Sequence, residues 1–89
     1  MAGKLAHPDK DVLLFTGDGA FGYGIMEYET AIRYGINFTP VVLNDALWGM
    51  IMRSEAKKRL REKFVGLKLS EVRYDKIVEA LGGYGELVT

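Results

Sequence analysis

The chain has 89 residues, is 48% hydrophobic, carries no formal net charge at pH 7 and contains no cysteine. The lack of cysteine excludes a disulfide framework and a thiolate zinc site, and the balanced charge gives no general attraction to nucleic acid or to membranes. Because there is neither an apolar run of roughly 20 residues nor a signal peptide, we expect one small cytoplasmic domain over residues 1–89, without a nucleic-acid or membrane partner.

The N-terminal half has the pattern of a strand–helix–strand unit. Residues 1–6 are typical of the last turn of a helix, and residues 12–16 form an apolar run that predicts a strand buried on both faces. The glycine-rich stretch 17–24 is expected to be a loop. Apolar spacing predicts a helix over 25–34, and residues 38–43 predict a second strand, so we expect a right-handed βαβ crossover.

The C-terminal half is predicted to be mainly helical. One helix is expected over 46–63, irregular at first around Gly49, and another over 71–81, ended by the glycine pair that follows it. Leu87 and Val88 predict the onset of a third strand. The expected fold class is α/β: a partial doubly wound, mainly parallel sheet with the outline of a fragment of a larger domain.

Two acidic motifs follow the two predicted strands. Gly17-Asp18-Gly19 and Asn44-Asp45 are separated by 24 residues. The carboxyl ends of neighbouring parallel strands meet at one edge of a sheet, where two carboxylates can hold a hard cation. Mg²⁺ takes oxygen ligands and usually keeps a phosphate partner. The pattern therefore predicts a metal-bridged diphosphate, with Asp18, Asp45 and the carbonyl of Leu47 as ligands.

Two alternatives remain open at this level. Residues 17–22 also match the dinucleotide fingerprint G-x-G-x-x-G, with Asp45 in the place of a ribose-binding acid, which would suit a Rossmann-type oxidoreductase module. A carboxylate at Asp18 would repel a pyrophosphate there unless a cation intervenes, which weakens that interpretation. In the other alternative, the two aspartates only cap loops and helices, and the chain is a non-catalytic fragment.

The residues around the two motifs resemble those of a known family. GDG followed by Asn-Asp resembles the thiamine diphosphate motif, GDG followed by NN, with Asp45 in place of the usual metal-ligating Asn. The stretch 17–50, together with RYDKIVEALGGYGELVT, is similar to the C-terminal cofactor domain of the acetolactate synthase, benzaldehyde lyase and 2-hydroxyacyl-CoA lyase group. This resemblance, which covers nearly the whole chain, implies an acetolactate synthase-like transferase or lyase that acts on 2-keto acids or related acyl donors.

The resemblance also implies a set of site residues. Thiamine diphosphate and Mg²⁺ are the implied cofactors, and Asp18, Asp45 and Leu47 are the implied metal ligands. The family's activating glutamate comes from another domain, usually of a partner subunit. No catalytic residue is therefore assigned, and the lone chain is expected to be inactive. The resemblance also implies that the full enzyme is a homo-oligomer with a small-molecule substrate. The implied cofactor-binding residues are Gly17, Asp18, Gly19, Ala20, Phe21, Asn44, Asp45, Leu47, Trp48, Gly49 and Met50.

Three remaining features are interpreted more simply. The basic run over 57–63 predicts a solvated helix face, with a nucleic-acid patch as the alternative. His7 precedes a proline and is expected at a surface turn. Trp48 is expected either beside the cofactor or in the core. Ile51 stands where some pyruvate decarboxylases carry a catalytic glutamate, so a carboligase or lyase is favoured.

Overall fold

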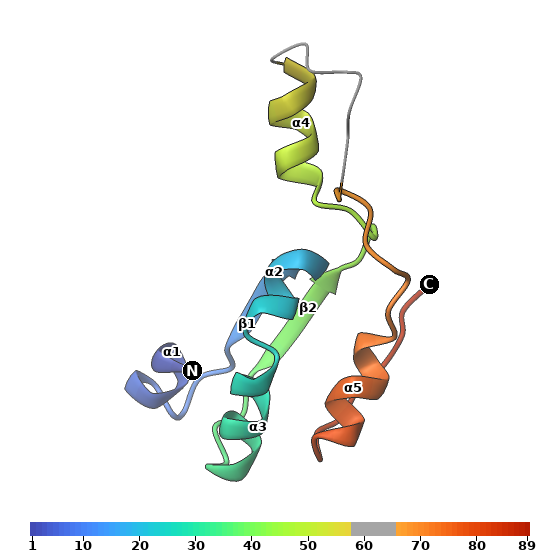
Figure 1. The fold of residues 1–89 in the computed structure, drawn as a ribbon. Coiled ribbons are helices and arrows are strands. Elements are labelled where there is room, and N and C mark those ends of the chain that lie inside the picture. Colours follow the sequence, from blue (N-terminus) through green and yellow to red (C-terminus); the bar gives the residue numbers. More distant parts are fainter. Residues whose placement is uncertain (58–65) are drawn as a thin grey trace.

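The computed structural model describes residues 1–57 and 66–89 as an α/β unit built on a pair of parallel strands (Figure 1). The last third of the predicted helix 46–63 (residues 58–63) and most of the basic run lie outside the described residues. The elements, in chain order, are α1 (Ala2–Ala6), β1 (Leu13–Gly17), α2 (Asp18–Tyr23), α3 (Met26–Arg33), β2 (Thr39–Leu43), α4 (Gly49–Lys57) and α5 (Tyr74–Ala80).

The register of the two strands fixes where the site lies. Leu13 pairs with Thr39 at one end of the ladder, and Gly17 pairs with Leu43 at the other. Both strands therefore end at the same edge of the sheet, and the residues that follow them leave this carboxyl edge together. The prediction of a βαβ unit is confirmed, since α2 and α3 connect two adjacent parallel strands.

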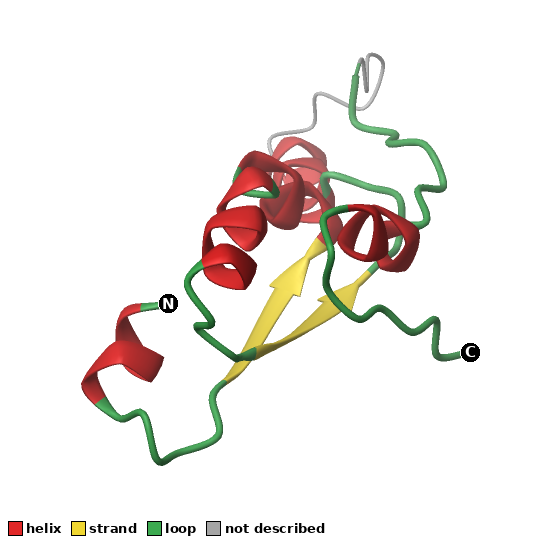
Figure 2. Ribbon diagram, turned by 90° about the horizontal axis from the view of Figure 1, so that it is seen from below, coloured by secondary structure: helices red, strands yellow, loops and turns green. Residues whose placement is uncertain are grey.

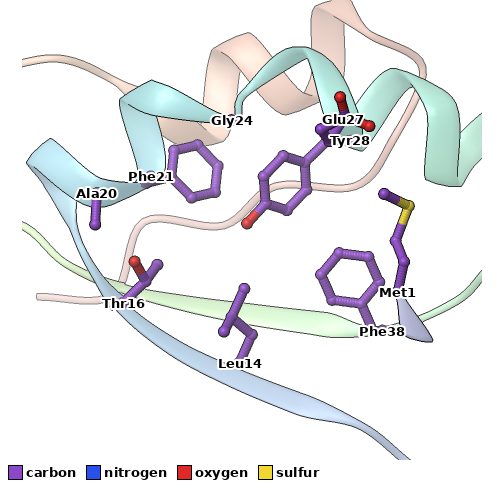
Figure 3. A pocket seen from close by; sticks show the side chains of 9 residues that line it. All are labelled: Met1, Leu14, Thr16, Ala20, Phe21, Gly24, Glu27, Tyr28 and Phe38. Carbon is purple, nitrogen blue, oxygen red and sulfur yellow. The ribbon is translucent and has the colours of Figure 1, made fainter. Parts of the chain in front are cut away.

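The helices of the described chain cover only one face of this sheet. Leu14 and Thr16 face α2 and α3, and they line a cavity of about 260 Å³ together with aromatic side chains (Figure 3). Leu13 and Phe15 point the other way and are 60% and 67% exposed. The predicted burial of β1 on both faces is thus wrong for the described residues, because α2, α3 and α5 pack on one face and leave Leu13 and Phe15 exposed on the other.

An aromatic cluster forms the centre of the covered face. The Phe21 ring is 3% exposed, and its centroid lies 4.6 Å from that of Tyr28 and 5.3 Å from that of Tyr74. Tyr28 in turn lies 5.5 Å from Phe38. These contacts place α5 on the same side of the sheet as α2 and α3, whereas α4 extends away from the sheet (Figures 1 and 2).

Two glycines with positive φ end helices in the way the sequence predicts. Gly35 has φ +64°, and the bonds Gly35 N–H to Ile32 O and Ile36 N–H to Ala31 O form a Schellman motif after α3. Gly82, with φ +94°, ends α5 by the same pattern. A residue with a Cβ would be strained at either position.

Four predicted elements differ from the structure. Residues 17–24 are not a loop, because α2 begins at Asp18 directly after β1. The helix predicted over 46–63 starts only at Gly49, since the preceding residues form turns and a short bridge to Lys68. The helix predicted over 71–81 is shorter, at Tyr74–Ala80. In the described residues Leu87 and Val88 form no strand, since no neighbouring strand reaches them, and both are exposed.

Within residues 1–57 and 66–89, none of the helices has the length and apolar character needed to cross a bilayer.

Candidate cofactor-binding site

Asp18 is the most deeply buried side chain at the carboxyl edge, with only 2% of its surface exposed. Its Oδ1 atom accepts a hydrogen bond of 2.9 Å from the Gly19 N–H. Its Oδ2 atom is buried and has no hydrogen-bond partner among the described residues. A buried carboxylate oxygen without a partner is costly, and a bound cation is one of the few groups that offsets the cost.

Tyr74, the first residue of α5, lies near enough to Asp18 for the two groups to interact electrostatically. Burial, and secondly the negative charge of Asp18, raise the pKa of the Tyr74 hydroxyl above its ordinary value. The Tyr74 ring also packs edge-on against Phe21, which follows Asp18 in α2. The contact between Tyr74 and Phe21 therefore joins α5 to α2, the helix that carries Asp18.

The loop of residues 44–48, which connects β2 to α4 and is called the second loop below, is shaped by its own side chains. Asn44 Oδ1 accepts from Ala46 N–H at 3.3 Å, and Asp45 Oδ1 accepts from Leu47 N–H at 3.2 Å, so two Asx turns overlap. Asn44 Nδ2 donates to the carbonyl of Val72 at 3.2 Å, which joins the loop to the segment before α5. Ala46 adopts a φ of +54° within this loop, a conformation that alanine rarely takes.

The carbonyl of Leu47 is left out of the backbone pairing around it. Leu47 and Lys68 form an antiparallel bridge, but the two hydrogen bonds come from the flanking residues: Trp48 N–H to Leu67 O and Leu69 N–H to Ala46 O. In such a pair the groups of the central residues point away from the partner strand. The Leu47 oxygen is therefore available as a ligand, as its implied role requires.

Two close contacts connect the loop of residues 44–48 to its neighbours, one with the start of α2 and one with the start of α4. A methyl group placed on Gly19 would come within 2.6 Å of the six-membered ring of Trp48, so that ring rests directly on the Gly19 backbone. One placed on Gly49 would come within 3.4 Å of Asp45 Oδ2, so the Asp45 carboxylate lies near the first residue of α4.

The remaining implied site residues fall into two groups. The side chains of Ala20 and Phe21 turn into the cavity under α2, so only their backbone N–H groups are candidates for contact with a diphosphate (Figure 3). Met50 is 86% exposed on α4. Two contacts have no signal in the sequence: those of Asn44 with Val72 and of Gly19 with Trp48. They join segments that are far apart in the chain or depend on side-chain rotamers.

The donor set fits a cation that is shared with a phosphate. Among the residues that the structure describes, no cluster of three or more His, Cys, Asp or Glu side chains could hold a metal ion. Two carboxylates and one carbonyl at this edge leave about half of an octahedral shell for other oxygens. The Oδ2 atom of Asp18 and the carbonyl of Leu47, neither of which has a hydrogen-bond partner in the described part of the chain, are oxygen ligands of the kind that Mg²⁺ accepts.

Comparison with known proteins identifies the class to which this site belongs. The family described as "Thiamine pyrophosphate enzyme, C-terminal TPP binding domain" matches residues 1–89. The chain therefore belongs to the thiamine pyrophosphate-binding domains of thiamine pyrophosphate-dependent enzymes. This membership decides against the dinucleotide-binding alternative.

Individual relatives agree with this assignment. The chain is 38% identical to the "Probable acetolactate synthase" of Mycobacterium bovis, over 100% of this chain and 16% of that protein. It is 33% identical to "2-hydroxyacyl-CoA lyase 2" of Caenorhabditis elegans, over 99% of this chain and 13% of that protein. The thiamine diphosphate-dependent 4-hydroxybenzoylformate decarboxylase of Rhodococcus jostii RHA1 superposes with a TM-score of 0.81 and 28% identity, over 89% of this chain and 15% of that one. The chain thus spans about one sixth or less of the length of these proteins.

Proposed function

We propose that this protein binds thiamine diphosphate through a Mg²⁺ ion at the carboxyl edge of its sheet. Asp18 Oδ2, a carboxylate oxygen of Asp45 and the carbonyl of Leu47 are the proposed ligands. The observation that carries the proposal is the buried Oδ2 atom of Asp18, which has no partner in the described structure at the edge where both strands end. Diphosphate oxygens and a water molecule complete the shell.

The other site residues position these ligands and the diphosphate. Gly17 and Gly19 allow the backbone to pass close to the phosphates, and the N–H groups that follow them are the proposed donors. Asn44 orders the second loop through its bonds to Ala46 and Val72. Trp48, Gly49 and Met50 border the bound cofactor in this proposal.

We further propose that the site serves an acetolactate synthase-like carboligase or lyase that acts on 2-keto acids or related acyl donors. When bound, thiamine diphosphate supplies the electron sink for this chemistry. The chain's own residues bind and orient it. The side chain of Ile51, 46% exposed on α4, has no proton to transfer, so the proton steps are assigned to groups outside this chain. A glutamate from a further domain or a partner subunit is the proposed activating group.

Native mass spectrometry of the purified protein, with Mg²⁺ and thiamine diphosphate added, tests the proposal. We expect an assembly that contains this chain and a further polypeptide or copy, and that gains the mass of the cofactor and of the ion. A chelator should remove both together. Binding of NAD(H) without a metal would instead support a dinucleotide-binding module, and an assembly that binds neither cofactor would refute the proposed function.

A further inference from the structure

The only tryptophan of the chain, Trp48, is the last residue of the loop between β2 and α4, and its ring lies against the start of α2. Three ring atoms of Trp48 lie 2.6–3.1 Å from the point where a Cβ of Gly19 would stand, so the ring is in contact with the backbone of α2. Gly19 is the residue whose N–H donates to Asp18 Oδ1. The indole ring therefore touches the peptide unit that fixes the buried carboxylate.

The backbone of Trp48 is held equally firmly on the other side. Its N–H donates to the carbonyl of Leu67 at 2.9 Å, and its own carbonyl accepts from Met52 N–H at 3.0 Å, at the start of α4. Leu67, whose carbonyl accepts the bond from Trp48, is only 6% exposed, so this hydrogen bond ties Trp48 to a buried residue. Trp48 also directly follows Leu47, whose carbonyl is a proposed ligand, so a shift of the ring shifts that ligand.

The ring has support on its outer side as well. The Tyr23 ring, at the end of α2, lies 5.4 Å from the Trp48 ring, with 51° between the ring planes. Gly19 and Tyr23 lie one helical turn apart in α2, and both contact the indole ring. They therefore hold the ring against this helix. A flat ring fills this space, whereas a side chain on Gly19 would compete for it.

We infer that Trp48 is a positioning residue that locks the start of α2, which carries Asp18, to the loop of residues 44–48, which carries Asp45 and Leu47. The inference rests on the proposed function, since it assigns Trp48 a role in holding Asp18 and Leu47 at fixed relative positions. It also gives Gly19 a specific reason to be glycine: no positive φ is needed there, but the space of its side chain is taken by the indole ring.

A double-mutant cycle tests the lock in the cofactor-binding assembly that we expect native mass spectrometry to reveal. The variants are Gly19→Ala, Trp48→Ala and both together, with Mg²⁺ affinity measured by calorimetry at saturating thiamine diphosphate. We expect Trp48→Ala to weaken Mg²⁺ binding about 10- to 100-fold, the usual range when the support of a metal ligand is removed. Gly19→Ala should be at least as damaging alone, but should add little to Trp48→Ala, because the clash is then gone.

Matched variants separate positioning from general damage to the fold. Gly22→Ala, in the same helix, is the control, because a methyl group there meets nothing within 4 Å and should leave Mg²⁺ affinity unchanged. Trp48→Phe keeps a flat ring and should restore affinity to within about 3-fold of the native protein. Trp48→Leu carries the test if the alanine variant does not fold. In the native protein, the emission of the sole tryptophan should change when Mg²⁺ and cofactor bind.

The outcomes distinguish the proposed cofactor binding from the positioning role of Trp48. A native assembly that binds no Mg²⁺ and no thiamine diphosphate overturns the proposed function and this inference with it. A native assembly that binds both, while the Trp48 variants bind Mg²⁺ as tightly as it does, overturns only the lock. Independent effects of Gly19→Ala and Trp48→Ala would also overturn it.

Discussion

The two segments that follow the strands, α2 and the loop of residues 44–48, each place an aspartate at the carboxyl edge of the sheet but are built differently. After β1, the chain enters a helix at once, and Asp18 is buried with one oxygen fixed by Gly19. After β2, the helix is delayed until Gly49, and the exposed Asn44 and Asp45 shape the backbone through Asx turns. The helix α2 therefore offers a rigid, preformed ligand, while the loop of residues 44–48 depends on local hydrogen bonds that it makes for itself.

This comparison predicts unequal effects when the two carboxylates are removed. Asp18→Asn should weaken Mg²⁺-dependent binding of thiamine diphosphate by more than about 100-fold, because a buried charged ligand contributes about 3 kcal/mol or more. Calorimetry of the native assembly and of the variant measures the ratio. Asp11→Asn, at an exposed aspartate before β1, is the matched control and should change nothing. Equal Mg²⁺ affinity in the Asp18 variant would refute the rigid-ligand interpretation.

A smaller effect is expected at Asp45. Asp45→Asn keeps an oxygen ligand and the acceptor for Leu47 N–H, but removes one negative charge from beside the diphosphate. We expect Mg²⁺ affinity to fall about 3- to 10-fold, as for a partly exposed charge pair worth about 1 kcal/mol. Titration of Mg²⁺ at fixed cofactor concentration gives the midpoint for both proteins. An unchanged Mg²⁺ requirement would mean that the Asp45 charge does not reach the cation.

A variant of Asn44 tests whether the second loop depends on the hydrogen bonds of its own side chains. Asn44→Ala removes the bonds to Ala46 N–H and to the Val72 carbonyl, and should lower the free energy of unfolding by about 1 kcal/mol. Chemical denaturation followed by circular dichroism measures the change. Asn37→Ala, at an exposed position before β2, serves as the comparison and should stay within about 0.5 kcal/mol of the native value. Identical losses in both variants would show that Asn44 does not order its loop.

The smallest effect is expected for the ion pair between Arg73 and Asp75, which follows Val72, the residue whose carbonyl accepts a hydrogen bond from Asn44. The Arg73 guanidinium donates to both carboxylate oxygens of Asp75, at 2.8 and 2.6 Å, and lowers the pKa of that carboxyl from 3.8 to about 2. The stabilising contribution is therefore fully present above about pH 4 and is lost as the pH falls through about 2. Unfolding curves between pH 5 and 2 should show this loss, and Asp75→Asn should remove that part of the pH dependence. A variant with the same acid profile as the native chain would contradict it.

The N-terminal half of the fold is largely predictable from local patterns. The β1 run, the helix that ends at Gly35 and the β2 strand all lie within one or two residues of their predicted bounds. Their signals are short-range: apolar runs for the strands, apolar spacing for α3, and a glycine that adopts positive φ. The predicted loop over 17–24 was wrong, because its glycines suggest a break, while tertiary packing of Phe21 favours a helix there.

The C-terminal half is less predictable for the same reason. Helical spacing over 71–81 extends too far, because residues before Tyr74 contribute the Val72 carbonyl to Asn44 and the Arg73 side chain to Asp75. The bridge between Leu47 and Lys68 joins segments about 20 residues apart and delays the start of α4. Neither contact has a periodic signal in the chain.

The sequence by itself determined the fold class, the two acidic motifs and their placement after two strands, since these depend on local propensity and on spacing. It also carried the resemblance that family membership confirms. Within residues 1–57 and 66–89, it is tertiary packing that buries Asp18 with one oxygen unpaired, leaves the Leu47 carbonyl outside the backbone pairing and lays the Trp48 ring on Gly19. Burial, orphaned atoms and ring contacts arise from the packing of distant segments, which no local pattern encodes.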